Sequence, residues 1–252
     1  MKAPLFAIIT ICYNAAETIG RTLKSVDSQS FTDYEHVIID GASTDGTQAL
    51  VGQYASERRR IISEPDKGLY DAMNKGMAAS TGRYLIFLNA GDKFHAADTL
   101  ACIAAAIAEN DAPGIVYGQT DIVDNDGRYL RPRHLSAPPE LSVKSFAEGM
   151  LVCHQAFVAS RSVAGDYNLK YRFSADYDWC IRCLQRSHKN VGLGTTVLID
   201  YLEEGVTTRH FKASLKERFG IMAHYYGLVP TAMRHIKFLS RWYKRKKDGA
   251  RQ

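Results

Sequence analysis

The chain has 252 residues, 46% of them hydrophobic and 23% charged, with only 7 prolines. This size and composition fit one α/β domain with a small appendage, and they exclude a disordered chain. The formal net charge is +5, yet eight Lys or Arg and no Asp or Glu lie between Arg218 and Lys247. The rest of the chain is therefore net acidic, which excludes a basic nucleic-acid-binding body.

Five cysteines are scattered along the chain and lie mostly in apolar runs: Cys12, Cys102, Cys153, Cys180 and Cys183. An odd, scattered set indicates buried, reduced thiols and not a disulfide framework. The N-terminal residues lack the pattern of a secretion signal. No run reaches the roughly 18 apolar residues of a membrane-spanning helix. We therefore expect a cytoplasmic protein.

The first part of the chain alternates predicted strands with predicted helices. Apolar, β-branched runs predict strands at 5–12, 36–40, 61–62 and 83–88, and helical patterns fill 14–28, 47–56, 69–79 and 96–110. The first of these helices is expected to begin at Asn14, three residues before Glu17, as in a capping box. Alternation at this spacing predicts a doubly wound α/β fold with a mainly parallel sheet.

The second part of the chain has a different pattern. Residues 114–117 and 121–129 predict a β-hairpin across the Asn125-Asp126-Gly127 turn. Residues 131–149 read as a loop, 174–187 as a helix, 191–201 as a strand and 212–247 as mainly helical. This order predicts further strands after the parallel sheet and a helical C-terminal extension.

Polar residues follow three of the predicted strands: Tyr13-Asn14, Asp40-Gly41 and Asn89 to Asp92. In open α/β sheets, ligands bind beyond the carboxyl ends of the strands. One such residue alone is commonly a helix cap or a turn residue. Three groups on separate strands together indicate a binding site. Neither G-x-G-x-x-G nor a P-loop is present, which disfavours NAD-dependent Rossmann enzymes and the commonest kinases.

Three blocks of sequence resemble the inverting family 2 glycosyltransferases, which have the GT-A fold. The first joins Tyr13-Asn14 and Glu17 to Ile39 through Thr47; the second runs from Asp66-Lys67-Gly68 through Asn74 to Phe87–Asp92; the third contains His154-Gln155 and Tyr171 to Arg182. The blocks lie within residues 5–185 and are most similar to transferases of bacterial exopolysaccharide, of the colanic-acid type. The resemblance implies a GT-A catalytic domain over residues 1–210, with a nucleotide-sugar half (1–110) and an acceptor half (111–210).

The resemblance implies inverting transfer of a sugar from a nucleotide-sugar donor to a glycan or lipid-linked acceptor, in cell-surface polysaccharide biosynthesis. A UDP-sugar is favoured, and GDP- or dTDP-sugars fit the same residues. Asp40 would accept the imino hydrogen of the base, and Tyr13 would lie against the base or ribose. The implied nucleotide contacts are Tyr13, Asn14, Glu17, Asp40, Ser43, Asp66 and Asn74; the donor sugar and diphosphate would meet Asn89, Ala90 and Gly91. His154 and Gln155 would line the acceptor side.

The same resemblance implies a catalytic base and a cation site. Asp176 aligns with the carboxylate that takes the proton of the acceptor hydroxyl, and Asp178 is its alternative. The family usually has Asp-x-Asp-Asp at residues 89–92, where this chain has Asn-Ala-Gly-Asp. Mg²⁺ or Mn²⁺ would bind Asp92, with His210 as a second ligand. Two alternatives stay open: a metal-independent enzyme in which Arg or His replaces the cation, and a non-catalytic sugar-nucleotide-binding subunit.

Residues 211–252 form a predicted basic amphipathic tail. Leu228, Ala232, Ile236, Leu239 and Tyr243 recur at helical spacing among the cationic residues. Such a helix can lie on an anionic membrane surface. The alternative is an ordinary helix packed on the domain, with a solvated charged end. The first interpretation predicts a peripheral protein on the inner face of the cytoplasmic membrane; no nucleic-acid partner is expected.

Overall fold

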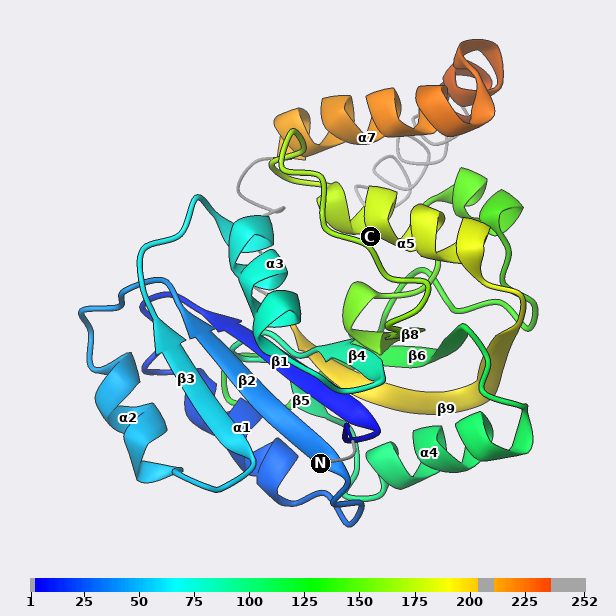
Figure 1. The fold of residues 1–252 in the computed structure, drawn as a ribbon. Helices are drawn as coiled ribbons and strands as arrows, with labels where there is room; N and C mark the ends of the chain where they lie inside the picture. The colour runs from blue at the N-terminus through cyan, green and yellow to red at the C-terminus, as the bar shows by residue number, and fades with distance from the viewer. Residues whose placement is uncertain (1–2, 204–210, 237–252) are drawn as a thin grey trace, which may run out of the picture.

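The computed structural model describes residues 3–203 and 211–236, which form a nine-stranded mixed sheet with helices on both faces (Figure 1). The sheet order is β3-β2-β1-β4-β8-β6-β9-β5, with β7 paired to β6. Helices α3, α5 and α7 lie above the sheet in Figure 1, and α1, α2 and α4 lie below it. The predicted helix-flanked α/β sheet is confirmed.

The first four strands are parallel, as predicted: β1 (Phe6–Cys12), β2 (Tyr34–Asp40), β3 (Arg59–Ser63) and β4 (Tyr84–Phe87). Every residue of β1 is buried. A central parallel strand is covered on both faces, which explains its unbroken run of apolar residues. In the register, Cys12 pairs with Asp40, so β1 and β2 end side by side.

The remaining strands extend the sheet with mixed directions. They are β5 (Lys93–Phe94), β6 (Ile115–Val123), β7 (Tyr129–Pro132), β8 (Phe157–Ser160) and β9 (Asn190–Leu202). The predicted hairpin is present as β6–β7, but β6 is one continuous strand, and β7 runs through Pro132 into the expected loop. A proline is tolerated there because β7 is an edge strand. Strands β5 and β8 were not predicted.

The helices are α1 (Ile19–Asp27), α2 (Thr47–Gln53), α3 (Leu69–Ala79), α4 (Thr99–Glu109), α5 (Ala175–Arg186) and α7 (Phe211–Tyr226). Two short 3₁₀ segments, η1 (Val143–Glu148) and η2 (His154–Ala156), precede β8. Helix α3 has the predicted bounds. Gly68, with φ +117°, begins it in a backbone conformation that favours glycine.

The predicted capping box at the start of α1 was wrong. The helix begins at Ile19, and Asn14 adopts a left-handed φ of +47°. The Asn14 Oδ1 atom accepts a hydrogen bond from Thr44 N (3.0 Å), and Asn14 N donates to Ser43 Oγ (2.8 Å). These polar groups therefore tie the end of β1 to the loop after β2 and cap no helix.

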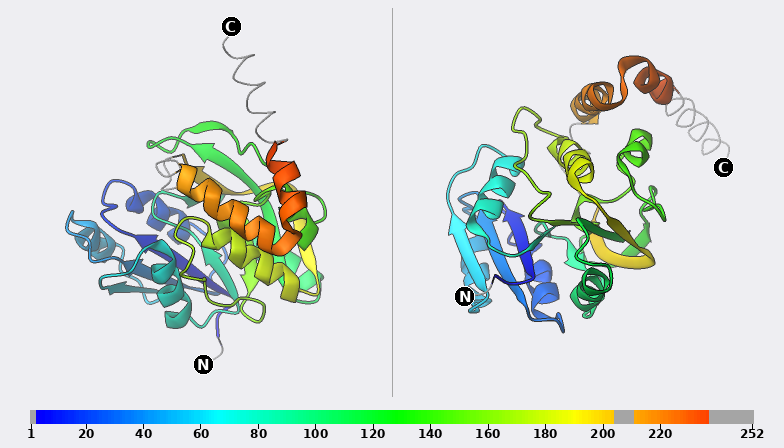
Figure 2. Two further views of the ribbon diagram at one scale, coloured as in Figure 1. Left: turned by 90° about the horizontal axis from the view of Figure 1, so that it is seen from above. Right: turned by 45° about the vertical axis from the view of Figure 1, so that its right-hand side comes forward.

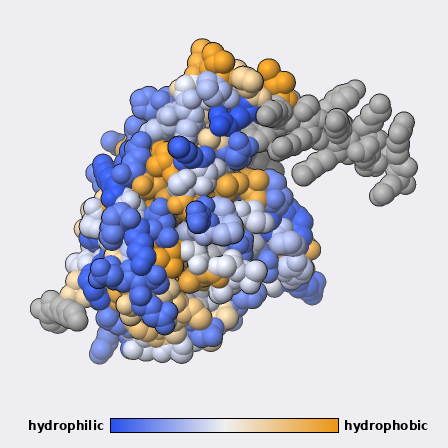
Figure 3. Space-filling view, turned by 90° about the vertical axis from the view of Figure 1, so that its right-hand side faces the viewer, coloured by the Kyte–Doolittle hydropathy of each residue, from blue (hydrophilic) through white to orange (hydrophobic). Residues whose placement is uncertain are grey.

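The C-terminal segment packs on the domain through α7 and exposes apolar side chains beyond it. Helix α7 runs over α5 (Figure 2), with Ile221 and Met222 buried. Residues 228–236 are helical and expose Leu228, Val229, Met233 and Ile236. Figure 3 shows hydrophobic side chains gathered at this end of the molecule, at the top of the view. Among the described residues, no helix combines the length and apolar character needed to cross a bilayer.

Candidate active site

Two neighbouring cavities open where the parallel strands end. The first, of about 850 Å³, is lined by Tyr13, Gly41 and Asp66, among others. The second, of about 680 Å³, is lined by Asn89, Asp92, His154 and Asp176, among others. Leu69 and Tyr70, at the start of α3, line both cavities. The polar residues expected at the strand ends therefore do gather along one edge of the sheet.

Asp40 is fully buried at the end of β2, directly before Gly41. Its Oδ2 atom accepts hydrogen bonds from Ser63 Oγ (2.6 Å) and Ser43 N (3.1 Å), and Ser43 Oγ donates to Oδ1. Burial and the Asp40 carboxylate raise the pKa of the Cys12 thiol, so this cysteine stays protonated. Asp40 thus holds the loop that begins at Gly41, and Gly41 lines the first cavity.

Gly41 allows two cavity residues to approach the end of β2. A Cβ atom at this position would lie 2.7 Å from Asp66 Oδ2 and 3.2 Å from Tyr13 Cδ2. Only glycine avoids both contacts. Tyr13 is 66% exposed, so its ring offers a free face to a planar ligand. Asp66 Oδ1 accepts a bond from Gly68 N (2.8 Å), which fixes the turn into α3.

Five of the seven predicted nucleotide contacts line neither cavity: Asn14, Glu17, Asp40, Ser43 and Asn74. Ser43 bonds Asp40, as described above. Asn74 clamps the backbone of Tyr167, donating to its O (3.1 Å) and accepting from its N (2.7 Å). Glu17 is exposed on the turn before α1. Among the seven predicted nucleotide contacts, Tyr13 and Asp66 are the two that line the first cavity.

The turn at residues 89–92 follows β4 in the chain and contacts the end of β9. Gly91 has φ +100°, and a Cβ atom there would lie 2.7 Å from Leu202 Cδ2. The positive φ therefore favours glycine at this position, and a larger residue would also have to displace the Leu202 side chain. Asp92 is buried, and its two oxygens accept bonds from Leu202 N (3.0 Å) and Gln155 Nε2 (2.9 Å). Burial raises the pKa of Asp92 to about 7.

Unlike Asp92, Asn89 has a side-chain oxygen that accepts no hydrogen bond from any described residue. Its Oδ1 atom is buried and has no hydrogen-bond partner among the described residues, and the side chain lines the second cavity. An orphaned amide oxygen is costly unless a ligand satisfies it. Ala90 lines the same cavity. The donor set for a cation is therefore one neutral oxygen and one buried carboxylate, and His210 lies outside the described residues.

His154 and Gln155, predicted on the acceptor side, both line the second cavity. The His154 Nε2 atom is 2.6 Å from Tyr167 Oη, and its ring packs against Phe87 with centroids 4.9 Å apart. Burial lowers the pKa of His154 to about 4, so the imidazole is neutral at physiological pH. Because Gln155 donates to Asp92, it connects the acceptor side to the 89–92 turn.

Asp176, the predicted base, is half-buried and lines the second cavity. Its Oδ1 atom accepts hydrogen bonds from Tyr70 Oη (3.0 Å) and from Tyr177 N (2.9 Å). Asp178, the alternative, is buried elsewhere: its oxygens contact Arg182 Nε and Tyr225 Oη, each at 2.8 Å. Of the two carboxylates, only Asp176 reaches a cavity.

Several basic residues of the second cavity were not predicted from the sequence. Arg131, Arg133, His134 and Arg218 all line it. Arg131 pairs with Glu203 (2.6 Å), and Arg133 donates to backbone carbonyls, including Met150 O (2.7 Å). The buried Arg218 Nε atom has no partner among the described residues. The Arg-x-Arg-His spacing at 131–134 is a sequence signal for a basic site, although the segment lies in a predicted loop. Arg218 lies in the predicted C-terminal tail.

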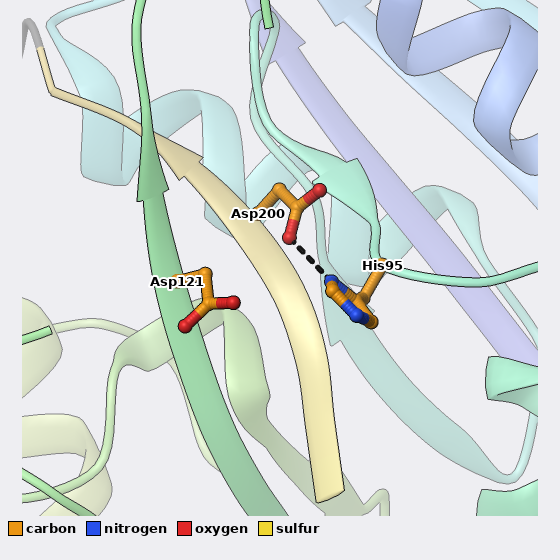
Figure 4. Close-up of side chains that lie close together, drawn as sticks. All are labelled: His95, Asp121 and Asp200. Carbon is orange, nitrogen blue, oxygen red and sulfur yellow. Dashed lines mark hydrogen bonds and ion pairs between the residues drawn. The ribbon is translucent and has the colours of Figure 1, made fainter. Parts of the chain in front are cut away.

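His95, Asp121 and Asp200 form a separate group across the sheet (Figure 4). Their potential ligand atoms lie within 4.8 Å of one another. Asp121 and Asp200 are register partners, and their neighbours Ile122 and Tyr201 line the second cavity. Adjacent strand residues point to opposite faces. Lys93 Nζ (2.7 Å) and His95 Nδ1 (2.7 Å) already contact Asp200. This group therefore takes no part in either cavity.

Comparison with known proteins gives a consistent result. Residues 7–167 match the family model described as "Glycosyl transferase family 2". A PGL/p-HBAD biosynthesis glycosyltransferase of Mycobacterium bovis is 38% identical over 189 residues, which cover 73% of this chain and 71% of that protein. The amylovoran biosynthesis glycosyltransferase AmsB of Erwinia amylovora is 28% identical over 232 residues, covering 86% and 76% of the two chains.

Solved structures share the fold at low sequence identity. S. aureus TarS 1–349 in complex with UDP-GlcNAc has a TM-score of 0.71 at 17% identity, over 92% of this chain and 73% of that chain. A mannosyltransferase from Pyrobaculum calidifontis, in complex with GDP-Man and Mn²⁺, has a TM-score of 0.61 at 16% identity, over 95% and 76%. The arrangement of sheet and helices is that of these proteins, the GT-A fold.

Proposed function

Because the chain belongs to glycosyl transferase family 2 and is a glycosyltransferase, we propose that it transfers a sugar from a nucleotide-sugar to an acceptor hydroxyl with inversion. One observation carries the proposal. The Asp176 carboxylate lines the second cavity, next to the cavity that has an exposed aromatic face at Tyr13. The proposed base would therefore lie next to the proposed nucleotide site, as direct displacement at the anomeric carbon requires.

The nucleotide is proposed to occupy the first cavity, with its base against Tyr13. Asp40, through the loop it holds, and Asp66 would fix that end of the donor, and a UDP-sugar is favoured. One structural neighbour was solved in complex with UDP-GlcNAc and another with GDP-Man, which supports a nucleotide-sugar donor without selecting its base. The donor sugar would then extend past Tyr70 into the second cavity, towards Asn89 and Ala90.

In the proposed mechanism, the oxygen of the acceptor hydroxyl attacks the anomeric carbon, and Asp176 Oδ2 accepts the proton of that hydroxyl. The bond to the diphosphate breaks on the opposite face of the sugar, which inverts the configuration. The neutral His154 imidazole and Gln155 would orient the acceptor. Arg218 Nε is buried with no hydrogen-bond partner among the described residues, so it would be available to the negative charge of the leaving diphosphate.

We further propose a divalent cation, Mg²⁺ or Mn²⁺, held by Asn89 and Asp92 together with donor phosphates. The orphaned Asn89 Oδ1 atom supports this fit, because a cation would satisfy it. Such a cation supplies charge stabilisation to the departing diphosphate.

The acceptor is proposed to be a growing glycan or lipid-linked glycan at the inner face of the cytoplasmic membrane. Residues 1–110 would bind the donor and residues 111–210 the acceptor. The names of the relatives include amylovoran biosynthesis and PGL/p-HBAD biosynthesis, which favour a cell-surface polysaccharide or glycolipid. Leu228, Val229, Met233 and Ile236 are exposed, and basic residues follow them in the sequence. These apolar side chains would contact anionic lipid.

A transfer assay tests the proposed function. Purified protein is incubated with UDP- and GDP-sugars, with and without a lipid-extract acceptor, and the product's anomeric configuration is determined by NMR. Inversion relative to the donor is expected, and a product of retained configuration would contradict the mechanism. Binding of a donor by calorimetry without any transfer or hydrolysis would instead support the non-catalytic alternative.

A further inference from the structure

We propose that Tyr70 is a positioning residue for Asp176: its hydroxyl holds one carboxylate oxygen so that the other faces the acceptor. This inference rests on the proposed function, since it takes Asp176 as the base. Tyr70 lies in the first turn of α3 and Asp176 in the first turn of α5. The hydrogen bond between them spans 106 residues of the chain and links the two proposed halves.

The two oxygens of Asp176 have different surroundings. Tyr70 Oη (3.0 Å) and Tyr177 N (2.9 Å) both donate to Oδ1, whereas no described residue donates to Oδ2. An oxygen that already accepts two bonds is a poor proton acceptor. The proton of the acceptor hydroxyl is therefore directed to Oδ2. The two donors also prevent the carboxylate from rotating, which fixes its angle of approach.

Tyr70 is held rigidly enough to serve as this donor. It is 6% exposed, and its ring stacks on Tyr167 with centroids 5.6 Å apart. Tyr167 in turn stacks on Trp179 of α5, with centroids 5.1 Å apart. Burial and the nearby Asp176 carboxylate raise the pKa of Tyr70 well above its ordinary value, so the hydroxyl keeps its proton.

Tyr70 also connects the base to the donor site. Together with Leu69 it forms the wall shared by the two cavities. Its ring would lie beside the donor, while its hydroxyl contacts the base. The residue therefore sets the position of the base relative to the anomeric carbon.

Few charged groups other than Asp176 itself act near its carboxylate. The titratable groups that interact with it or with Tyr70, or that share its cavity wall, are Tyr70 (α3), Cys153, His154 (η2), Tyr167, Cys180 (α5), Tyr201 (β9), and Glu217 and Arg218 (α7). Burial lowers the pKa of His154 to about 4 and raises the pKa values of the phenols and the two thiols, so His154, the phenols and the thiols are neutral near pH 7. The cavity's remaining ionisable side chains, Asp92, Arg131, Arg133, His134 and Glu203, belong to the 89–92 turn and to the β7–β9 side.

The test compares Tyr70→Phe with Tyr167→Phe. Both variants keep the aromatic stack, but only the first removes a donor to Asp176; Tyr167 Oη bonds His154 instead. Hydrogen bonds to a carboxylate favour its charged form. In Tyr70→Phe we expect the acidic limb of the pH profile of kcat/KM to move to higher pH by about one pH unit. We also expect kcat to fall by about tenfold. Donor Kd should change by less than about twofold, since donor binding does not need the base.

Tyr167→Phe should leave the acidic limb where it is in the natural protein. An unmoved limb in Tyr70→Phe, or an equal shift in both variants, overturns the positioning role. Asp176→Asn separates this failure from that of the proposed function: near-normal turnover there refutes the base itself. If Tyr70→Phe does not fold, 3-fluorotyrosine at position 70 supplies a stronger donor. The limb should then move to lower pH, and an unchanged profile overturns the proposal.

Discussion

Asp176 and Asp178 leave the same helical turn in different directions: one lines the second cavity, and the other bonds Arg182 and Tyr225. Residues i and i+2 of an α-helix are separated by about 200° around the helix axis. We expect Asp176→Asn to lower kcat by about 10²–10⁴, the usual contribution of a general base. Donor Kd and melting temperature should stay near those of the natural protein, because the base acts in the transition state.

Asp178→Asn is the matched control for this experiment. It removes a buried carboxylate from its ion pair with Arg182, so the free energy of unfolding should fall by about 1–3 kcal/mol. Turnover of the folded fraction should change little. If Asp178→Asn abolishes turnover and Asp176→Asn does not, the assignment of the base is reversed.

Asp40→Asn tests the proposed nucleotide site. A charge-assisted bond to the base, directly or through the loop that Asp40 holds, is worth roughly 1.5–3 kcal/mol, so nucleotide Kd should rise by about ten- to hundredfold. Calorimetry with UDP and GDP measures the nucleotide Kd. Ser63→Ala removes one donor to the same carboxylate without changing its charge. Equal loss of affinity in both variants would mean that Asp40 only holds the loop.

The core strands and several helices could be predicted because local signals there agree with the packing. The run from Phe6 to Cys12 is apolar and β-branched, as a strand buried on both faces requires. Helix α3 lies between Gly68 and the Thr81-Gly82 turn, and its predicted bounds are those observed. The 89–92 turn and Asp176 were found through the family resemblance, because their spacing is specific.

Other features depend on contacts between distant residues and left no local pattern. Strand β5 has two residues and exists because it pairs with β9. Asn14 has the sequence context of a helix cap, but the loop at Ser43 and Thr44 offers its polar groups better partners. The bond between Tyr70 and Asp176 joins α3 to α5, and no spacing in the sequence predicts it.

Asn89→Asp tests the proposed cation site. The change places a carboxylate where an amide oxygen is buried with no hydrogen-bond partner among the described residues. A buried, unpaired charge is costly, so the melting temperature should fall without metal; Mn²⁺ with UDP should restore it. Asn190→Asp is the control, because its Oδ1 is also orphaned but lies outside both cavities. A failure of Mn²⁺ to stabilise Asn89→Asp more than Asn190→Asp would refute the site.

The burial of His36 predicts that the free energy of unfolding decreases at acidic pH. The His36 Nε2 atom is 2.9 Å from Thr10 Oγ1, and its Nδ1 atom accepts a bond from Arg59 Nε (3.1 Å). Burial, then the Arg59 charge, lowers the pKa of His36 from 6.5 to about 3. The unfolded chain therefore binds a proton below pH 6.5 that the folded chain refuses, and stability is lost as pH falls from 6.5 towards 3.

At pH 4.5 the refused proton on His36 lowers the free energy of unfolding by roughly 2–3 kcal/mol relative to pH 7. His36→Gln should be less stable than the natural protein at pH 7, but its free energy of unfolding should decrease less between pH 7 and pH 4.5. Urea unfolding at both pH values measures the two differences. Parallel decreases in the two proteins would show that His36 titrates normally in the fold.

The exposed apolar face after α7 predicts membrane association that does not depend on the catalytic site. Val229 and Met233 are 69% and 59% exposed, so replacing both with Ser should change the melting temperature little. Each side chain buried in lipid contributes about 1.5–3 kcal/mol, so binding to anionic phosphatidylglycerol vesicles should fall at least tenfold in the double variant. Ile61→Ser, an exposed apolar residue on β3, is the control and should bind as the natural protein does. Turnover on a soluble acceptor analogue should persist in both. Equal vesicle binding by the double variant and the control would leave residues 228–236 without a role at the membrane.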